Sequence, residues 1–339
     1  MTVDIIVGGQ FGSEGKGKML SYLCKKDMYD VVVRCGGPNS GHTITINNEQ
    51  IVLKQIPVGV VNKNIKLFLS AGCLIDPDIL FDEINMFGLN PDRLGIDNNA
   101  VIINTDYKDK EINLIKKIGS TGSGTGIAVA NRVLRNSDVV LAKDIPELKE
   151  YLVCTSDKVM DNIFHGKRVA IEGTQGFGLS LYHSPYYPYV TSRDTTASGF
   201  LSEVGISPFL VSNIIMIIRT FPIRVAGNSG PLPKEISWEI IQKESGYPCK
   251  LQEFTSVTKK LRRVARFDSE IVKRTISVNR PTKIALMGID YIDYNSKDVK
   301  DFNHLTKKSR DFVYKIEQIL YQKIDYIGTG IMDSCIVER

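Results

Sequence analysis

The sequence lacks several features that would place it in a special class of protein. No apolar run approaches the length of about 20 residues that spans a bilayer. The six cysteines form no C-x-x-C pair, and no signal segment precedes the first expected strand. The net charge is only +5, and the basic residues form no long run. We therefore expect a cytoplasmic protein with reduced thiols that binds neither a membrane nor nucleic acid.

Compositional bias is also missing. Hydrophobic residues make up 42% of the 339 positions and charged residues 24%, with only 13 prolines, which is typical of a globular protein. The length would suit one large domain or two. Because no internal repeat, low-complexity stretch or linker interrupts the chain, we expect a single domain over residues 1–339.

The first glycine-rich segment is GQFGSEGKGK at residues 9–18. An apolar run at residues 3–7 precedes it, and residues 19–23 carry the apolar spacing of a helix that faces a core. This order predicts a strand, a tight turn and a helix N-terminus whose free N–H groups suit a phosphate. Residues 12–18 fit the G-x-x-x-x-G-K pattern of a P-loop, but Met19 stands where that pattern has a magnesium-binding Ser or Thr. The alternative is a structural turn with two lysines in solvent.

A second glycine-rich loop, GGPNSGHT at residues 36–43, follows an expected buried strand at residues 30–34. Ligands of open α/β sheets bind at such strand ends. The loop carries His42, one of four histidines in the chain. A lone histidine often has only a structural role, but its position between Gly41 and Thr43, beside the expected phosphate loop, favours a functional one.

Hydrophobic periodicity predicts the remaining elements. Residues 43–57 alternate about Asn47 and Asn48, which indicates a hairpin at the edge of the sheet. Because strands alternate with helices, we expect the α/β class, with a large, mainly parallel sheet covered on both faces. Further strands are expected at residues 67–70, 101–104, 169–172, 214–220 and 283–288, and helices at residues 77–87, 111–118, 145–163, 269–279 and 309–321.

Three more polar segments fall where the chain leaves regular structure. GSTGSGTG at residues 119–126 would suit either a phosphate site or a flexible loop. EGTQGFGL at residues 172–179 follows a strand and precedes the aromatic residues 185–196, whose rings equally suit packing. TSVTKKLRR at residues 255–263 is either a solvated basic turn or a site where a forked guanidinium binds a carboxylate.

Taken in order, the motifs GQFGSEGKGK, GGPNSGHT, STGSGTG, EGTQG, YPYVTS, VTKKLRR and a terminal GTG resemble those of adenylosuccinate synthetases. The resemblance covers nearly the whole chain and implies the fold of that family, with its P-loop-like first turn. The family phosphorylates the 6-oxygen of IMP with GTP and then displaces the phosphate with the amine of aspartate, using magnesium. A ligase that binds Mg2+, two nucleotides and L-aspartate is therefore implied.

The resemblance also implies roles for individual residues. The catalytic set is Ser13, Lys16, His42 and Gln175, in which Lys16 holds the transferring phosphoryl group and His42 is the acid at the 6-oxygen. Ser13 and the Gly41 carbonyl are the implied magnesium ligands. Arg135 matches an arginine that reaches into the partner's site, which implies a homodimer. The implied nucleoside monophosphate site comprises Ser13, Asn39, Thr121, Arg135, Gln175, Leu179, Thr191 and Val225. The implied aspartate site comprises Val257, Thr258 and Arg262. The implied phosphate-donor site comprises Gly12, Glu14, Gly15, Lys16, Gly17, Lys18, Thr43, Asp290, Thr329 and Gly330.

One departure from the family concerns the choice of substrate. Ser13 stands where the family has an aspartate that removes the N1 proton of IMP and binds magnesium, and a serine with ordinary chemistry is a poor base. A purine with a 2-amino group would need the space, and a serine hydroxyl can accept a hydrogen bond from that amine. The resemblance thus narrows to the phage branch, which uses dGMP, aspartate and ATP to make the precursor of 2,6-diaminopurine deoxynucleotide. A phage enzyme of this kind would lie in the host cytoplasm.

Other departures leave alternatives open. Lys260 replaces an arginine, Gly288 a lysine near the donor base and Ile331 a proline. The donor is therefore ATP, dATP or GTP. Three functions remain: the dGMP-using ligase, an ordinary synthetase that uses IMP and GTP, and an inactive nucleotide-binding relative.

Overall fold

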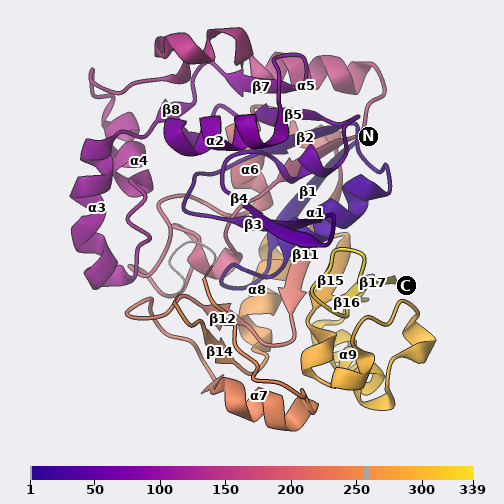
Figure 1. The fold of residues 1–339 in the computed structure, drawn as a ribbon. Coiled ribbons are helices and arrows are strands. Elements are labelled where there is room, and N and C mark those ends of the chain that lie inside the picture. Colours follow the sequence, from indigo (N-terminus) through magenta and orange to yellow (C-terminus); the bar gives the residue numbers. More distant parts are fainter. Residues whose placement is uncertain (1, 256–259) are drawn as a thin grey trace.

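The architecture is an α/β fold built on one ten-stranded sheet, as predicted. The computed structural model describes residues 2–255 and 260–339 (Figure 1). All neighbouring strands of this sheet run parallel except the last pair, β16 and β17. In spatial order the strands are β17 (Ile336–Glu338), β16 (Tyr326–Gly328), β15 (Lys283–Met287), β11 (Val211–Arg219), β1 (Val3–Gly8), β10 (Val169–Glu172), β2 (Val31–Arg34), β5 (Lys66–Leu69), β7 (Leu94–Asp97) and β9 (Leu152–Val153).

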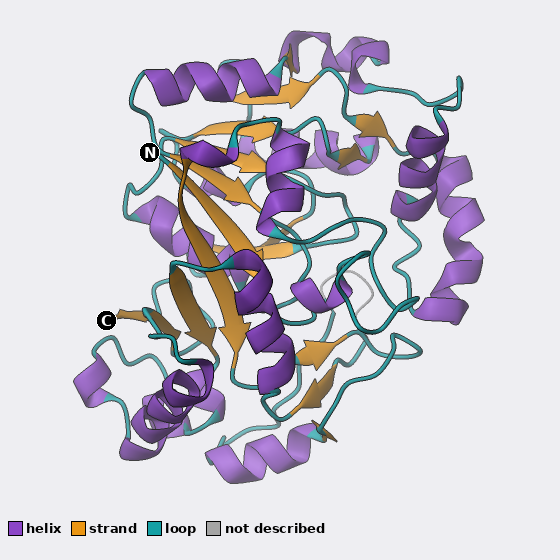
Figure 2. Ribbon diagram, turned by 180° about the vertical axis from the view of Figure 1, so that it is seen from behind, coloured by secondary structure: helices purple, strands orange, loops and turns teal. Residues whose placement is uncertain are grey.

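Helices cover both faces of the sheet, which explains why its central strands are apolar almost throughout. Along β1, Ile5 and Val7 pack into one core, whereas Ile6 packs into the other. Figure 2 shows the twisted strands with helices on either side. One face is covered by α5 (Thr155–Phe164), α6 (Ala197–Val204), α8 (Ser269–Asn279) and α9 (Lys307–Leu320), and the other by α1 (Lys16–Lys25) and α2 (Pro77–Phe87). Helix α7 (Trp238–Ser245) lies beyond the strand ends, beside the 3-10 helix Ile289–Tyr291.

The predicted hairpin exists but was wrongly placed at the edge of the sheet. Strands β3 (His42–Ile46) and β4 (Glu49–Leu53) form their own two-stranded sheet around a turn at Asn47 and Asn48. Ile44 and Leu53 are buried in the same core as α1, so the hairpin covers the face of the large sheet instead of extending it. This packing brings His42 next to the first helix.

The prediction of one helix over residues 145–163 is wrong. The chain instead forms a 3-10 helix, then β9, and α5 begins only at Thr155. The reason is a distant cap, since the Asp97 carboxylate accepts hydrogen bonds from the Thr155 backbone N–H (2.9 Å) and hydroxyl (2.6 Å).

Within residues 2–255 and 260–339, no helix combines the length and apolar character needed to cross a bilayer.

Two further boundaries differ because of a local cap. The strand expected at residues 101–104 ends as β8 (Val101–Ile102), and the helix expected at residues 111–118 begins earlier, as α3 (Thr105–Ile118). The Asn104 side chain accepts a hydrogen bond from the Tyr107 N–H (2.9 Å) and so starts the helix. The elements that were not predicted include α4 (Thr125–Leu134), which packs beside α3, and a small sheet of β12 (Ile223–Arg224), β14 (Arg263–Ala265) and β13 (Glu235–Ile236).

Candidate active site

Three adjoining cavities lie where the central strands end. The central cavity, of about 190 Å3, lies between the loops that follow β1, β2 and β10. It shares residues with a second cavity of about 400 Å3 toward α3, and with a third of about 610 Å3 toward β15. Adjoining cavities at the carboxyl ends of parallel strands are typical ligand sites.

Most residues expected to bind substrates line these cavities. Thr191 lines the second cavity and Gly41 the central one. Arg262 lies between the central and the third cavity. Val257 and Thr258 lie outside the described residues. The residues shared by the central and second cavities include Asn39, Thr121, Gln175, Leu179 and Val225. The donor-site residues on the central or third cavity are Gly12, Glu14, Gly15, Lys16, Gly17, Lys18, Thr43, Asp290 and Gly330.

Two expected site residues lie elsewhere. Thr329 is fully buried and its hydroxyl donates to the Val299 carbonyl (2.8 Å), so that its neighbour Gly330 faces the third cavity instead. Arg135 is exposed at the end of α4, where it lines a separate small cavity. A role for Arg135 in this site therefore depends on a second copy of the chain.

The first loop is built around the buried carboxylate of Glu14. Its Oε1 accepts hydrogen bonds from the backbone N–H groups of Gln10 (3.1 Å) and Gly12 (2.8 Å), and its Oε2 lies 2.7 Å from Lys16 Nζ. A Cβ on Gly176 would come within 2.2 Å of this carboxylate, which explains the glycine there. Because Glu14 is committed to these contacts, it holds the loop and the lysine in place and is not a free ligand.

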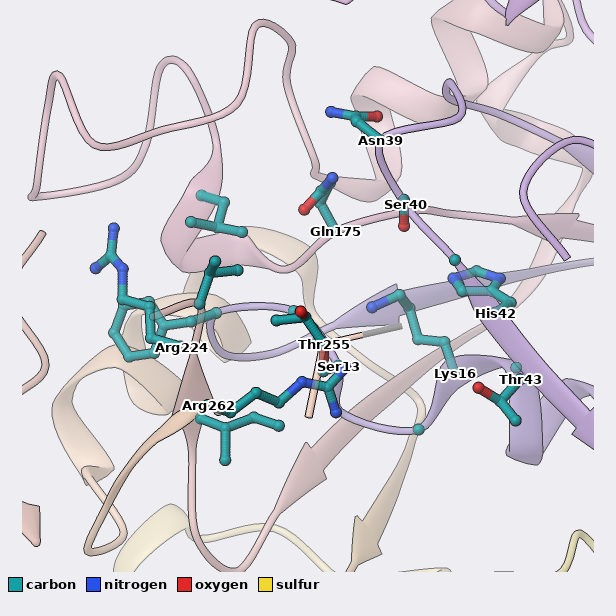
Figure 3. A pocket seen from close by; sticks show the side chains of 18 of the residues that line it. Ser13, Lys16, Asn39, Ser40, His42, Thr43, Gln175, Arg224, Thr255 and Arg262 are labelled. Carbon is teal, nitrogen blue, oxygen red and sulfur yellow. The ribbon is translucent and has the colours of Figure 1, made fainter. Parts of the chain in front are cut away.

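His42 is held by a buried carboxylate on the neighbouring strand. Its Nδ1 lies 2.5 Å from Oε1 of Glu172, which also accepts a hydrogen bond from Arg34 Nη1 (2.5 Å). The other Glu172 oxygen accepts from the Val58 N–H (2.7 Å). His42 Nε2 is buried and has no hydrogen-bond partner among residues 2–255 and 260–339. The imidazole lies on the central cavity, where Figure 3 shows it near Lys16.

Electrostatics keep this imidazole neutral. Burial lowers the pKa of His42 to about 4, although Glu172 acts in the opposite direction. Burial would raise the pKa of Glu172, but Arg34 and His42 outweigh it and the pKa is lowered. The arrangement therefore favours a neutral ring that donates from Nδ1 to Glu172 and carries its lone pair on Nε2.

Sequence reasoning missed the two residues that position His42. Arg34 ends β2 and Glu172 ends β10, and both are buried. A signal was present, since each is a charged residue that closes an otherwise apolar strand. Charged residues are rarely buried unless they are paired, and the two strands are neighbours in the sheet.

Arg224 was also missed, although it lines both the central and the second cavity. Its guanidinium lies 4.9 Å from the ring centroid of Phe11 and 5.6 Å from that of Tyr186. Burial lowers the pKa of Arg224 to about 10, so the group still carries its charge at neutral pH. A fixed cation beside the second cavity suits an anionic group such as a phosphate.

The third cavity holds a second pair of polar groups, the half-buried Tyr247 and the buried Asp290. Tyr247 donates a hydrogen bond to Asp290 Oδ2 (2.8 Å), and burial raises the pKa of Asp290 to about 6. Burial also lowers the pKa of Lys18 to about 8, and its Nζ donates to the carbonyls of Gly330 (2.6 Å) and Cys335 (3.0 Å). This cavity therefore combines two groups. The Asp290 carboxylate can accept a hydrogen bond from the base of a nucleotide, and the Lys18 ammonium belongs to the first glycine-rich loop.

A magnesium ion would find mainly neutral oxygens here. No group of three or more His, Cys, Asp or Glu side chains that could hold a metal exists in the part of the chain that the structure describes. Ser13 is exposed on the central and third cavities, and its hydroxyl makes no hydrogen bond with another described residue. Because Mg2+ keeps several waters and takes further oxygens from substrate phosphates, a hydroxyl and the Gly41 carbonyl fit such an ion.

Known proteins resemble this chain over nearly its whole length. The model of the adenylosuccinate synthetase family matches residues 5–142 and 140–297. The adenylosuccinate synthetase of Methanocaldococcus jannaschii is 43% identical, covering 97% of this chain and 94% of the relative, and that of Thermococcus sibiricus is 40% identical, covering 96% and 95%.

Two solved structures share the fold. Fully ligated adenylosuccinate synthetase from Plasmodium falciparum superposes with a TM-score of 0.89 at 21% identity, covering 100% of both chains. Succinoaminodeoxyadenylate synthetase from cyanophage S-2L, bound to dGMP and to dATP as an energy donor, gives a TM-score of 0.83 at 26% identity, covering 99% of this chain and 95% of that one. The family model and the relatives agree on a ligase that joins aspartate to a purine nucleotide. The chain belongs to the adenylosuccinate synthetase family.

Proposed function

We propose that this ligase uses dGMP as its purine nucleotide and ATP as its phosphate donor. The product would be 2-amino-2'-deoxy-N6-succinyladenylate, the precursor of a 2,6-diaminopurine nucleotide for phage DNA. The observation that carries the proposal is Ser13, a small hydroxyl residue on the central cavity where the family has an aspartate. The phage relative bound to dGMP and dATP supports it.

The chemistry would proceed in two displacements. First, the 6-oxygen attacks the γ-phosphorus of ATP, ADP leaves, and the N1 proton of the purine passes to solvent water. The amine of aspartate then forms a bond to C6, the C6–O bond breaks, and phosphate departs while the amine loses a proton. Transfer between two oxygens needs positioning and charge neutralisation more than covalent help. The glycine loop and Lys16 supply both in this chain.

Individual residues would act as follows. Lys16 and the loop N–H groups would hold the transferring phosphoryl group, while Gln175 and Asn39 would hold the purine nucleotide. Once it has gained a proton, His42 would donate a hydrogen bond to the 6-oxygen from Nε2, which is the ring atom that Glu172 leaves free. Magnesium, held by Ser13 and the Gly41 carbonyl, would neutralise charge on the phosphates. Asp290 and Gly330 would face the base of the donor.

A second candidate has its own support. The archaeal adenylosuccinate synthetases are more similar in sequence than the phage enzyme, at 43% against 26% identity. This favours an ordinary synthetase that uses IMP and GTP. The two candidates share the fold, the phosphate loop and His42, and they differ in what must fit against residue 13.

One assay separates the candidates. The purified protein is offered dGMP, GMP, IMP and AMP in parallel, each with aspartate, magnesium and either ATP or GTP. We expect the fastest phosphate release and succinyl-nucleotide formation with dGMP and ATP, since the 2-amino group has space beside Ser13. Faster turnover of IMP with GTP would establish the ordinary synthetase, and no turnover with any pair would establish an inactive relative.

Arg135 provides a test of a shared site between two subunits. Arg135→Ala and Lys16→Ala should each be nearly inactive alone, because each lacks a group that binds phosphate. Mixed subunits should regain about a quarter to a half of the wild-type rate, since a heterodimer of this kind contains one intact site. The measurement is turnover after mixing, with subunit exchange demonstrated by differently tagged chains.

Arg280→Ala is the matched control for this test. Like Arg135, Arg280 is exposed and ends a helix with a positive φ (47° against 58°), so the substitution causes the same backbone strain. It should leave turnover unchanged. Absence of recovery in a mixture with proven exchange would exclude a site completed by the partner's arginine.

A further inference from the structure

The carboxylate of Glu253 lies at the centre of a charged cluster that no role described so far explains. One oxygen accepts hydrogen bonds from Arg219 Nη1 (3.1 Å) and Arg262 Nη1 (3.0 Å), and the other accepts from Arg219 Nη2 and from the Tyr291 hydroxyl (2.9 Å). The side chains of Glu253, Arg219 and Arg262 are 19%, 9% and 15% exposed. We call Glu253, Arg219, Arg262 and Tyr291 the Glu253 cluster.

Backbone pairing fixes Glu253 beside Arg262. The Arg262 N–H donates to the Glu253 carbonyl (2.8 Å), and Phe254 and Leu261 form an antiparallel bridge. Two segments that are paired in this way hold their side chains at a set distance. The position of the Arg262 guanidinium is therefore defined by both the backbone and the carboxylate of Glu253.

Arg219 connects the same carboxylate to the first glycine-rich loop. Besides Glu253, its Nη1 donates to the carbonyl of Ser13 (3.1 Å). The Arg219 backbone is bound as well, since its N–H donates to Gln10 Oε1 (2.9 Å) and its carbonyl accepts from Gln10 Nε2 (3.1 Å). The first loop thus keeps its own support from Glu14 and Gln10, so loss of Glu253 should displace Arg262 far more than the loop that carries Ser13.

The charges of the cluster do not cancel. One carboxylate faces two guanidinium groups, and although burial would raise the pKa of Glu253, the two arginines lower it to about 2. Arg219 uses its Nη atoms on Glu253 and Ser13. Arg262 donates only through Nη1 among the described residues, and its side chain lines the central and third cavities (Figure 3). The excess positive charge is thus presented to the cavities by Arg262, whose remaining N–H groups suit a carboxylate.

We propose that Glu253 is a positioning residue for the amino-acid substrate, because it fixes the Arg262 guanidinium toward the cavities and ties it through Arg219 to the Ser13 loop. Glu253 itself does not touch the reacting atoms. The inference rests on the ligase activity with aspartate and not on the choice between dGMP and IMP. It places aspartate beside Arg262, whose position is fixed by Glu253. Through Arg219, Glu253 is also linked to the loop that would hold the phosphoryl group.

The test is whether Glu253→Gln changes the KM for aspartate while leaving kcat and the KM for the nucleotide nearly unchanged. Glutamine has the same shape, but its amide N–H groups would point at a guanidinium and its charge is gone. We expect the KM for aspartate to rise about tenfold or more, because the arginine loses its fixed position. The kcat and the KM of the nucleoside monophosphate should stay within about threefold of the wild type. The assay uses whichever nucleotide supports turnover, so it remains valid if the proposed dGMP preference fails.

Glu235→Gln is the matched control. Glu235 lies on β13 and pairs with Arg263, the residue next to Arg262. The Nε and Nη2 atoms of Arg263 donate hydrogen bonds to the Glu235 carboxylate (2.8 and 2.6 Å). The same substitution there removes an equally close ion pair next to the cluster. It should leave the KM for aspartate unchanged, which separates a specific effect from a general loss of stability.

Glu253→Asp covers the case in which the glutamine variant does not fold. Aspartate keeps the negative charge, but it is one methylene shorter and cannot reach both arginines as Glu253 does. A rise of about threefold or more in the KM for aspartate alone would support the proposal. An unchanged KM for aspartate in either folded variant would overturn it, as would equal rises in the KM values of aspartate and nucleotide.

Discussion

Replacing His42 with asparagine should lower kcat about a hundredfold or more while leaving nucleotide binding nearly intact. A positioned acid or base contributes on this scale. Asparagine is the informative choice because its amide can still donate to Glu172, as His42 Nδ1 does across 2.5 Å. The substitution therefore removes the free Nε2 without leaving the buried carboxylate unpaired. The measurements are steady-state turnover and nucleotide affinity by calorimetry.

His165→Asn is the control, since that histidine is exposed on the surface, at the end of α5. It should behave as the wild type. Unchanged turnover in His42→Asn would remove this imidazole from the mechanism. A loss of nucleotide affinity equal to the loss of turnover would instead assign His42 to binding.

The pH dependence of His42 follows from its surroundings. With a pKa of about 4 the ring is neutral in the free protein at neutral pH, so it has to gain a proton before it can donate one. Bound phosphates would favour the charged ring, because opposite charges raise the pKa of an imidazole. If the charged form is the acid, kcat should fall as the pH rises through the pKa of His42 in the complex. The asparagine variant should lack this limb of the profile.

Much of the fold could be predicted because its signals are local. The apolar run of β1, the glycines of residues 9–18 and the spacing in α1 are neighbours in sequence, and together they specify a strand, a turn and a helix. The failure at residues 145–163 has the opposite cause. The carboxylate that starts α5 belongs to Asp97, which is 58 positions away in the sequence. A periodic apolar pattern contains no information about such a cap.

The residues of the site also fall into a group that the sequence predicts and a group that it does not. The glycine-rich and polar motifs that resemble those of the family contain most of the residues that line the central and second cavities, because ligand-binding loops have distinctive compositions. The groups that hold those residues were missed. Glu172 and Glu253 act through pairs with Arg34 and Arg219, and these partners lie on different strands and loops. Pairing of this kind depends on the order of strands in the sheet, which the sequence does not state directly.

Changing Ser13 to aspartate should shift activity from dGMP toward IMP. The carboxylate would supply a base for the N1 proton and a magnesium ligand, and it would crowd the 2-amino group of dGMP. The backbone should tolerate the change, since Ser13 has a φ of 56° and aspartate adopts this conformation more readily than most residues. The expected result is a fall in kcat/KM for dGMP and a rise for IMP, measured side by side at equal concentrations.

Ser13→Ala separates the space beside residue 13 from the serine hydroxyl. Alanine keeps the space but removes the acceptor and the expected magnesium ligand. Turnover of both nucleotides should therefore fall, and dGMP should still be preferred, by a smaller margin. The unmodified protein should use IMP poorly, because bound IMP would cover the Ser13 hydroxyl without offering it an amino group, at a cost of about 1 to 3 kcal/mol. That cost corresponds to roughly 5- to 150-fold in kcat/KM. If the unmodified protein instead turned over IMP faster than dGMP, residue 13 would not select the 2-amino group, and the ordinary synthetase would be the correct assignment.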